Sequence, residues 1–252
     1  MAIQSNLTGE TPLPLHPFKP MPNNPFQLSP GRLEIWEYAL RPRDTKHDGC
    51  LSPAERERAQ NFYFDKHRQR FIGARTMLRR LLARYVQQTP ESLRFTENRY
   101  GKPQLITNES LQFNLSHSGE RALLAVGMCA PVGIDLEYFK ARDYHGIAKQ
   151  MFSVDEYHAF AQLPVYLQPL AFYHIWVQKE ALIKAAGLGL SYPTQQFTVP
   201  VRAPTQQRVA DERHQKTWNM ISWMPTNQCY AAMCYDPSIQ EIFYGQADDF
   251  TL

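Results

Sequence analysis

The feature of this sequence that most limits its possible folds is a helix-start pattern that occurs twice. Residues 52–55 (SPAE) and 153–156 (SVDE) each place a serine three positions before a glutamate, the pattern of a capping box at a helix N-terminus. The two serines are 101 residues apart, and so are Phe71 and Phe172 in the long helices expected to follow them. A repeat of this length predicts two similar lobes with the same order of helices and strands.

Hydrophobic periodicity around the two capping boxes predicts an α+β fold. We expect one long helix from about Arg68 to Gln87 and another from Phe172 to Leu190, closed by Gly187, which can take the left-handed cap conformation. Apolar residues that alternate or run together predict strands at Leu33–Tyr38, Leu111–Leu115, Ala122–Val126, Val132–Glu137, Phe197–Val201, Trp218–Trp223 and Tyr230–Tyr235. Each lobe is therefore predicted to be a long helix packed on a mainly antiparallel sheet.

Composition suggests where the lobes begin and end. Residues 1–30 contain seven prolines and almost no charge, which predicts an extended N-terminal leader. Residues 31–131 form the expected N-terminal lobe, and residues 132–252 form the expected C-terminal lobe. The segment that joins them, residues 127–132, is short, and a short linker implies tight contact between the lobes.

The second long helix carries an unusual row of side chains. Trp176, Glu180 and Lys184 recur every four residues, so they share one helix face. One interpretation is a surface salt bridge between Glu180 and Lys184. The other is a functional face, because an aromatic ring, a carboxylate and an amine in one row are more than a surface face requires.

A second acidic element favours the functional interpretation. In the strand at Val132–Glu137, alternation sends Ile134 and Leu136 to one side and Asp135 and Glu137 to the other. Two carboxylates on a strand and one on a helix are hard oxygen ligands of the kind that Mg²⁺ uses. The alternative is structural: Asp135 ends a strand, and Glu137 pairs with a nearby basic residue.

Composition and charge exclude several other classes of protein. The 43% hydrophobic and 20% charged residues are those of an ordinary globular protein, and no apolar run approaches the roughly 18 residues of a membrane span. Four cysteines without metal-site spacing and no evident signal peptide indicate a cytoplasmic protein. Twelve Lys/Arg against five Asp/Glu between Arg41 and Arg84 indicate a phosphorylated or acidic partner, whereas clustered aromatics argue against nucleic acid.

Six sequence features in order resemble the Sfp-type 4′-phosphopantetheinyl transferase family. The two central ones are VGIDLE at residues 132–137 and WVQKEALIKAAGLGL at residues 176–190. The others are the turn YGKP at 100–103, the stretch FNLSHSG at 113–119, and the helix starts SPAERER and MFSVDEY. Together they cover roughly residues 32 to 235.

The resemblance implies a pseudo-twofold arrangement of the lobes with the active site between them. It implies that Asp135, Glu137 and Glu180 bind Mg²⁺, and that a serine of an apo acyl or peptidyl carrier protein attacks the β-phosphate of coenzyme A. Phosphopantetheine is then transferred, and adenosine 3′,5′-bisphosphate leaves. Either Glu180 or a metal-bound hydroxide is the expected base, Asp135 belongs to the catalytic group, and Lys184 stabilises the developing charge.

The residues expected to bind coenzyme A lie in several motifs. They are Arg75, Gly101, Lys102, Pro103, Ser116, His117 and Lys184, with Ser116 and His117 expected in a turn after a strand. One position departs from the family pattern, because Glu55 stands where a lysine is found in Sfp itself. The resemblance therefore does not extend to a cofactor contact at this position.

Two other functions remain compatible with the residues alone. One is a Mg²⁺-dependent phosphohydrolase that acts on coenzyme A-like compounds with the same carboxylates. The other is a module that binds coenzyme A or a carrier protein without catalysis. For the leading hypothesis we expect coenzyme A and a carrier protein as partners, a monomer, and neither nucleic acid nor a membrane.

Overall fold

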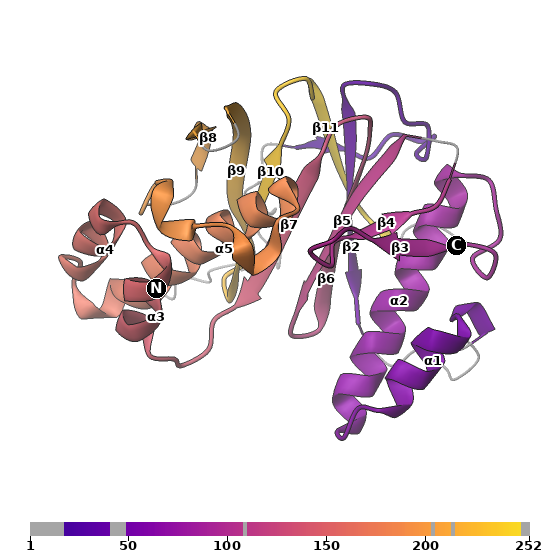
Figure 1. Ribbon diagram of the computed structural model, residues 1–252, viewed down its shortest axis with the longest axis horizontal. Helices are drawn as coiled ribbons and strands as arrows, with labels where there is room; N and C mark the ends of the chain where they lie inside the picture. The colour runs from indigo at the N-terminus through magenta and orange to yellow at the C-terminus, as the bar shows by residue number, and fades with distance from the viewer. Residues whose placement is uncertain (1–17, 41–48, 108–109, 203–204, 213–214, 248–252) are drawn as a thin grey trace, which may run out of the picture.

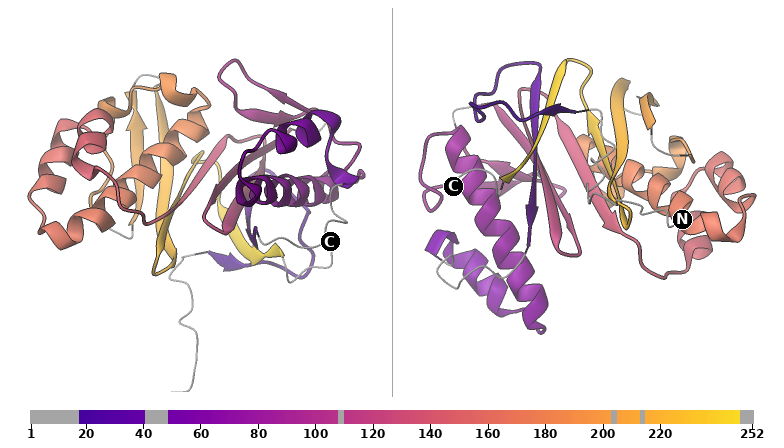
Figure 2. Two further views of the ribbon diagram at one scale, coloured as in Figure 1. Left: turned by 90° about the horizontal axis from the view of Figure 1, so that it is seen from below. Right: turned by 180° about the vertical axis from the view of Figure 1, so that it is seen from behind.

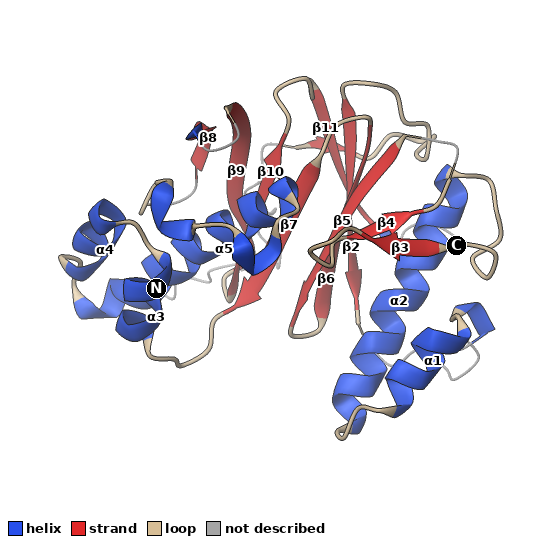
Figure 3. Ribbon diagram, in the orientation of Figure 1, coloured by secondary structure: helices blue, strands red, loops and turns tan. Residues whose placement is uncertain are grey.

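The fold is α+β, with two sheets packed between two layers of helices (Figures 1 and 3). A computed structural model describes residues 18–40, 49–107, 110–202, 205–212 and 215–247. Helix α2 covers the outer face of one sheet, and helix α5 with its neighbours covers the outer face of the other (Figure 2). The inner faces of the two sheets meet in the middle of the molecule.

The strands form two large sheets and one small hairpin. The first sheet has the order β1-β11-β2-β6-β5, with bounds Lys19–Pro20, Glu241–Gln246, Arg32–Ala39, Arg121–Met128 and Leu111–Ser118. The second has the order β7-β10-β9-β8, with bounds Val132–Tyr138, Cys229–Tyr235, Lys216–Thr226 and Thr205–Asp211. The hairpin joins β3 and β4, with bounds Phe95–Glu97 and Pro103–Leu105.

The described residues contain five α-helices and several short 3₁₀ turns. The α-helices α1 to α5 have the bounds Pro53–Gln60, Asp65–Tyr85, Tyr144–Met151, Val154–Ala161 and Gln168–Ala186. The 3₁₀ turns η2, η3 and η4 span Val165–Leu167, Gly189–Ser191 and Thr194–Gln196. Helix α5 ends as predicted, because Gly187 has a φ of 71° and its N–H donates to the carbonyl of Ile183. None of these helices combines the length and the apolar character that crossing a membrane requires.

The two sheets contain similar series of elements when a few additional elements are set aside. Apart from β3 and β4, β2 is followed by α1, α2, β5 and β6, and these strands lie in the order β2-β6-β5. Apart from α3 and β8, β7 is followed by α4, α5, β9 and β10, and these strands lie in the order β7-β10-β9. The lobes are in tight contact, because Ile35 and Leu123 share a core with Ile134 and Met233. The short linker predicted this contact correctly.

Both predicted capping boxes are present, and each carries a further ion pair. The side chain of Ser52 accepts from the N–H of Glu55, and that glutamate accepts from the N–H of Ser52. The same exchange links Ser153 and Glu156. Each glutamate then pairs with a basic residue of the long helix, at 2.7 Å from Arg79 in the first lobe and 2.8 Å from Lys179 in the second. The repeat thus includes a salt bridge that ties each short helix to its long helix.

The division of the chain at residue 132 differs from the structure at the C-terminal end. Strand β11 leaves the second lobe and pairs in parallel with β2, so it belongs to the sheet of the first lobe. Residues 18–30 are also more than a leader. Strand β1 pairs with β11, and Phe18 is buried, with its ring 4.9 Å from that of Trp223. Residues 1–17 of the expected leader lie outside the described residues, as does part of the basic segment at 41–48.

One predicted strand is wrong for a physical reason. Residues 197–201 show apolar alternation, and Phe197 and Val199 are indeed buried. Their hydrogen bonds, however, go to side chains and not to a neighbouring strand. Glu156 accepts from the N–H of Val199, and the ammonium of Lys179 donates to the carbonyl of Phe197. Buried backbone groups satisfied in this way need no sheet.

Candidate active site

Strand β7 presents its acidic residues to helix α5. Ile134 and Leu136 are fully buried between the two sheets, as predicted from the alternation. The opposite face begins at Gly133, where an added Cβ would lie 2.1 Å from the carbonyl oxygen of Ala181 in α5. No side chain fits at that distance, so glycine is required for the helix backbone to approach the strand. Asp135 follows on the same face.

This close approach brings Lys184 of α5 onto β7. Its ammonium donates to Oδ1 of Asp135 at 2.6 Å and to Oγ of Ser116 at 3.0 Å. It also lies 3.3 Å from the carbonyl oxygen of Ile134. The lysine is therefore held by groups from β5 and β7, and not by Glu180, its neighbour one turn earlier.

One pocket of about 320 Å³ gathers most of the predicted catalytic residues. It lies between β5, β7 and α5, and its lining residues are Leu115, Ser116, His117, Asp135, Leu136, Glu137, Trp176, Glu180 and Lys184. The three carboxylates predicted to bind a metal thus face the same space. Trp176 also lies there, so the whole row of side chains predicted on α5 meets the acidic strand.

The electrostatics of the pocket reflect crowded negative charge. Burial, and then the charges of Asp135 and Glu137, raise the pKa of Glu180 to about 7, against the opposing effect of Lys184. Burial and Asp135 also raise the pKa of Glu137. The pKa of His117 is lowered by burial and then by Lys184, which favours its neutral form. A cation placed among the carboxylates would relieve this repulsion.

The carboxylates fit a divalent cation by their chemistry. Asp135 is 4% exposed, and its Oδ2 atom is buried without a hydrogen-bond partner. Glu180 has no ion pair among the residues that the structure describes, although it is buried enough to raise its pKa. The described residues nevertheless contain no closed group of three or more potential metal ligands. The ammonium of Lys184 lies against Asp135 instead.

Ser116 and His117 line the pocket, but from a strand and not from a turn. Strand β5 continues to Ser118, and the turn begins only at Gly119, which has a φ of 58°. We expected the strand to end at Leu115. It continues because β6 pairs with it as far as Ser118, which lies opposite Arg121. The side chain of Ser116 then bonds to β7, accepting from the N–H of Leu136 and donating to Oδ1 of Asp135.

The other residues predicted to hold coenzyme A lie outside this pocket. Gly101 has a φ of 82° in the turn before β4, and Pro103 begins that strand. The ammonium of Lys102 donates to the carbonyl of Val132 at 3.0 Å, and burial lowers its pKa to about 8. Arg75 donates to Oε1 of Glu55 at 2.7 Å. Glu55, which departs from the family pattern, thus has a structural role, because it binds arginine side chains of α2.

Sequence reasoning missed two polar residues of the same motif. Ser118 donates to Oε2 of Glu137 at 3.0 Å, and Asn114 accepts from the N–H of Ile134 at 2.8 Å. The available signal was the alternation of polar residues in Asn114, Ser116 and Ser118, which places all three on one side of β5.

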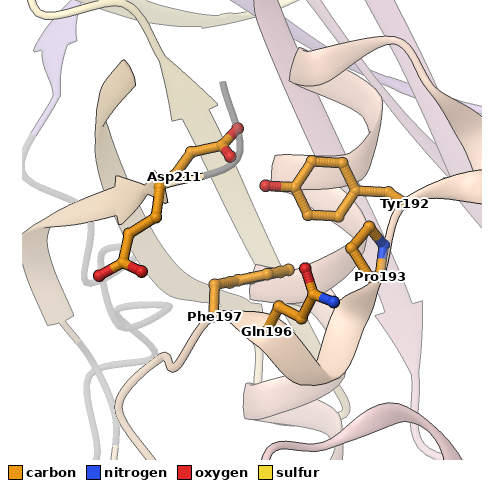
Figure 4. Close-up of a pocket in the computed structure, with 6 residues that line it drawn as sticks. Tyr192, Pro193, Gln196, Phe197 and Asp211 are labelled. Atoms are coloured by element: carbon orange, nitrogen blue, oxygen red, sulfur yellow. The ribbon is translucent and has the colours of Figure 1, made fainter. Parts of the chain in front are cut away.

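A larger cavity of about 550 Å³ lies elsewhere, between the turn at η4 and the end of β8 (Figure 4). One side of this cavity is formed by Tyr192, Pro193, Gln196 and Phe197, and the other side by Asp211 and Glu212. None of its described lining residues is cationic, and two are acidic. It is therefore poorly suited to a polyphosphate ligand.

Comparisons with known proteins agree with the site. One family model, described as the 4′-phosphopantetheinyl transferase superfamily, matches residues 131–234, and another, described as 4′-phosphopantetheinyl transferase, N-terminal, matches residues 42–129. The 4′-phosphopantetheinyl transferase HetI of Nostoc sp. is 33% identical over 226 residues, which cover 86% of this chain and 93% of the relative. The chain belongs to the 4′-phosphopantetheinyl transferase superfamily.

Further relatives of this transferase come from a bacterium and from a mammal. The 4′-phosphopantetheinyl transferase Sfp of Bacillus subtilis is 35% identical over 149 residues, covering 59% of this chain and 66% of the relative. A mouse protein, the L-aminoadipate-semialdehyde dehydrogenase-phosphopantetheinyl transferase, is 29% identical over 184 residues, covering 68% of this chain and 57% of the relative. The family predicted from the motifs is confirmed, and the chain is an enzyme that transfers phosphopantetheine.

Proposed function

We propose that this transferase moves 4′-phosphopantetheine from coenzyme A to a serine of an apo acyl or peptidyl carrier protein. The serine oxygen forms a new bond to the β-phosphorus, and the bond from that phosphorus to the bridging oxygen breaks. Adenosine 3′,5′-bisphosphate leaves with the bond electrons, and the serine proton passes to a base. The observation that carries the proposal is the pocket in which Asp135, Glu137 and Glu180 face Lys184, in a chain of this family.

Asp135, Glu137 and Glu180 are the residues that would hold Mg²⁺. A buried carboxylate oxygen of Asp135 without a partner supports this assignment, as does the raised pKa of Glu180. The cation would neutralise the carboxylates and the phosphate oxygens and so favour attack at phosphorus. The carboxylate oxygens belong to residues of β7 and α5. The close approach of α5 to Gly133 therefore decides whether these oxygens converge.

The remaining roles fall to residues of this chain. Glu180 is a candidate general base by its position, because its carboxylate lines the pocket that the serine must enter. Lys184 is held by three oxygen atoms at the edge of the pocket and can donate to the charge that develops on the pyrophosphate. Trp176 contributes an aromatic wall to the same pocket.

We infer that coenzyme A extends from this pocket towards the first lobe. Ser116 and His117 line the pocket directly, whereas Gly101, Lys102 and Pro103 lie in a turn whose Asn98 amide donates to the carbonyl of Gly187 at 2.7 Å. This turn is therefore packed against the end of α5. Lys102 has a depressed pKa and, among the residues that the structure describes, bonds to main-chain carbonyls, so a ligand phosphate would gain a cation there. For Arg75 a phosphate would have to share the guanidinium with Glu55.

The architecture supports two further proposals. The matching strand orders β2-β6-β5 and β7-β10-β9 favour lobes related by a pseudo-twofold axis, with the pocket at their junction. The carrier protein would approach this junction, because the serine must reach the carboxylates. We expect the transferase to act as a cytoplasmic monomer that uses neither nucleic acid nor a membrane.

Product analysis with and without a carrier protein tests the proposed reaction. The transferase is incubated with coenzyme A and Mg²⁺, and nucleotide products are separated by chromatography. We expect adenosine 3′,5′-bisphosphate only when an apo carrier is present, in an amount equal to the modified carrier. Release of phosphopantetheine without a carrier would indicate the alternative, a phosphohydrolase. Binding of coenzyme A without any product would indicate a non-catalytic module.

A further inference from the structure

Strands β5 and β7 are edge strands of different sheets, yet they lie against each other at the centre of the molecule (Figure 1). An edge strand leaves every second N–H group without a sheet partner, and a buried N–H group without a partner is costly. In β7 the groups concerned belong to Ile134, Leu136 and Tyr138, which point away from β10. Something other than a backbone ladder must accept from them.

Side chains of β5 accept from all three groups at regular spacing. The N–H of Ile134 donates to Asn114 at 2.8 Å, that of Leu136 to Ser116 at 3.2 Å, and that of Tyr138 to Ser118 at 3.1 Å. Both strands advance by two residues at each step, which is the repeat of a β-strand. The two sheets are therefore joined by a ladder in which one side is made of side chains, and we call Asn114, Ser116 and Ser118 the polar ladder.

The two serines of the polar ladder also bind the acidic residues. Ser116 donates its proton to Oδ1 of Asp135 at 2.9 Å, and Ser118 donates its proton to Oε2 of Glu137 at 3.0 Å. A hydroxyl has one proton to donate and two lone pairs that accept. In Ser116 all three are used, because its oxygen also accepts from Lys184. Its orientation is thus fixed by the backbone of β7 and by the catalytic lysine.

We propose that the polar ladder positions the active site, by fixing β7 against the first lobe and holding one oxygen each of Asp135 and Glu137 in place. With Oδ1 of Asp135 bonded to Ser116, Oδ2 is the oxygen left without a partner. A side chain that hydrogen-bonds to a metal ligand, without binding the metal itself, orients that ligand. Its removal commonly changes metal affinity by about 10–100-fold. This inference rests on the proposed metal-binding function of these carboxylates.

The test separates the ladder from the metal site by measuring two quantities on the full chain. Amide hydrogen exchange at Tyr138 reports the ladder, and calorimetric titration with Mn²⁺ reports cation binding without turnover. The variants are Ser118→Ala, which removes the hydroxyl, and Ser118→Thr, which retains it. Ser92→Ala is the matched control, because Ser92 is an exposed serine outside the site, bonded only to its own turn.

We expect Ser118→Ala to speed exchange of the Tyr138 amide by about fivefold, as for the loss of one hydrogen bond. We expect it also to weaken Mn²⁺ binding by about tenfold, with the KM for coenzyme A unchanged at saturating metal. Ser118→Thr should restore both, and Ser92→Ala should change neither. Unchanged exchange and unchanged Mn²⁺ affinity in Ser118→Ala would overturn the proposal, as would a threonine variant that behaves like the alanine variant.

Failure of the metal assignment would look different. Asp135→Ala would then bind Mn²⁺ as tightly as the wild type, whatever happens at the Tyr138 amide. If Ser118→Ala does not fold, Asn114→Ala and Asn114→Asp repeat the exchange test at Ile134, since only the aspartate keeps an acceptor there. Faster exchange in the alanine variant alone supports the ladder, and equal exchange in both contradicts it.

Discussion

The ammonium of Lys184 lies 2.6 Å from Oδ1 of Asp135, across the contact between helix α5 and strand β7. The lysine thus connects two elements of the pocket instead of forming a salt bridge within its own helix. Glu180, one turn away, keeps a carboxylate that faces the same pocket. This arrangement places a fixed positive charge beside the carboxylates on which the proposed chemistry depends.

We predict that Lys184→Met lowers kcat by about 100-fold or more, with a smaller change in the KM for coenzyme A. The reason is that a positive charge directed at the developing pyrophosphate acts mainly in the transition state. Steady-state kinetics at saturating Mg²⁺ provide the measurement. Lys184→Arg, which keeps the charge, is the comparison variant and should retain more activity. A large rise in KM with an unchanged kcat would show that Lys184 serves binding alone.

The capping glutamates give a prediction about stability. Glu55→Gln and Glu156→Gln keep the capping box, because glutamine also serves at this position. Each leaves a buried cation, Arg79 or Lys179, without its partner. We expect a loss of about 3 kcal/mol in the free energy of unfolding for each variant, measured by urea denaturation. Glu120→Gln removes only exposed ion pairs and should change little. Equal effects of all three variants would refute the structural role of these pairs.

His174 should make stability depend on pH in the acidic range. It is 1% exposed and bonded to Ser222, and burial lowers its pKa from 6.5 to about 4. Between these values the unfolded chain binds more protons than the folded one, so stability rises with pH and is lost as pH falls from 6.5 to 4. The contribution is about 3 kcal/mol. Thermal melts across this range should show a weaker slope for His174→Gln, but not for His67→Gln, which alters an exposed histidine. Parallel curves for the wild type and His174→Gln would contradict the prediction.

Lys102 should lower the stability of the fold while it contributes to the binding of coenzyme A. Burial lowers its pKa from 10.5 to about 8, so the folded chain binds fewer protons than the unfolded chain between these values, and wild-type stability rises with pH there. At pH 7 the buried charge is a cost, and we expect Lys102→Met to gain about 2 kcal/mol in stability while the KM for coenzyme A rises. Chemical denaturation and kinetics measure the two effects, with the exposed Lys19→Met as control. An unchanged KM would remove Lys102 from the cofactor site.

Local signals predicted the elements around the site well, because they act within a few residues. The capping boxes, the glycine cap at Gly187 and the alternation of β7 all depend on neighbours in the chain. We predicted that the three carboxylates and Lys184 share one site because of their spacing in the sequence and because of the family motifs. In the structure they line one pocket.

Local signals in the sequence could not predict contacts between distant segments. Nothing near Glu241 in sequence shows that β11 pairs with β2, since a parallel pairing across the molecule has no local signature. Glu55 was interpreted as a helix cap and as a departure from the family pattern, yet it binds two arginines of another helix. Likewise, Ser118 lies on β5 opposite Arg121 of β6, and its side chain finds its partners on β7, far away in the sequence. In each case the local structure is explained only by a group from elsewhere in the fold.

The most direct test of the account is the intact mass of an apo carrier protein after incubation with coenzyme A and increasing Mg²⁺. Wild-type transferase and Glu180→Gln, which keeps the shape of the side chain but not its charge, are compared at equal concentration. We expect the wild type to add one phosphopantetheine to a single serine, and Glu180→Gln to add none at the Mg²⁺ concentration that saturates the wild type. Full modification by Glu180→Gln at that same Mg²⁺ concentration would contradict the assignment of Asp135, Glu137 and Glu180 as the metal-binding centre of this transferase.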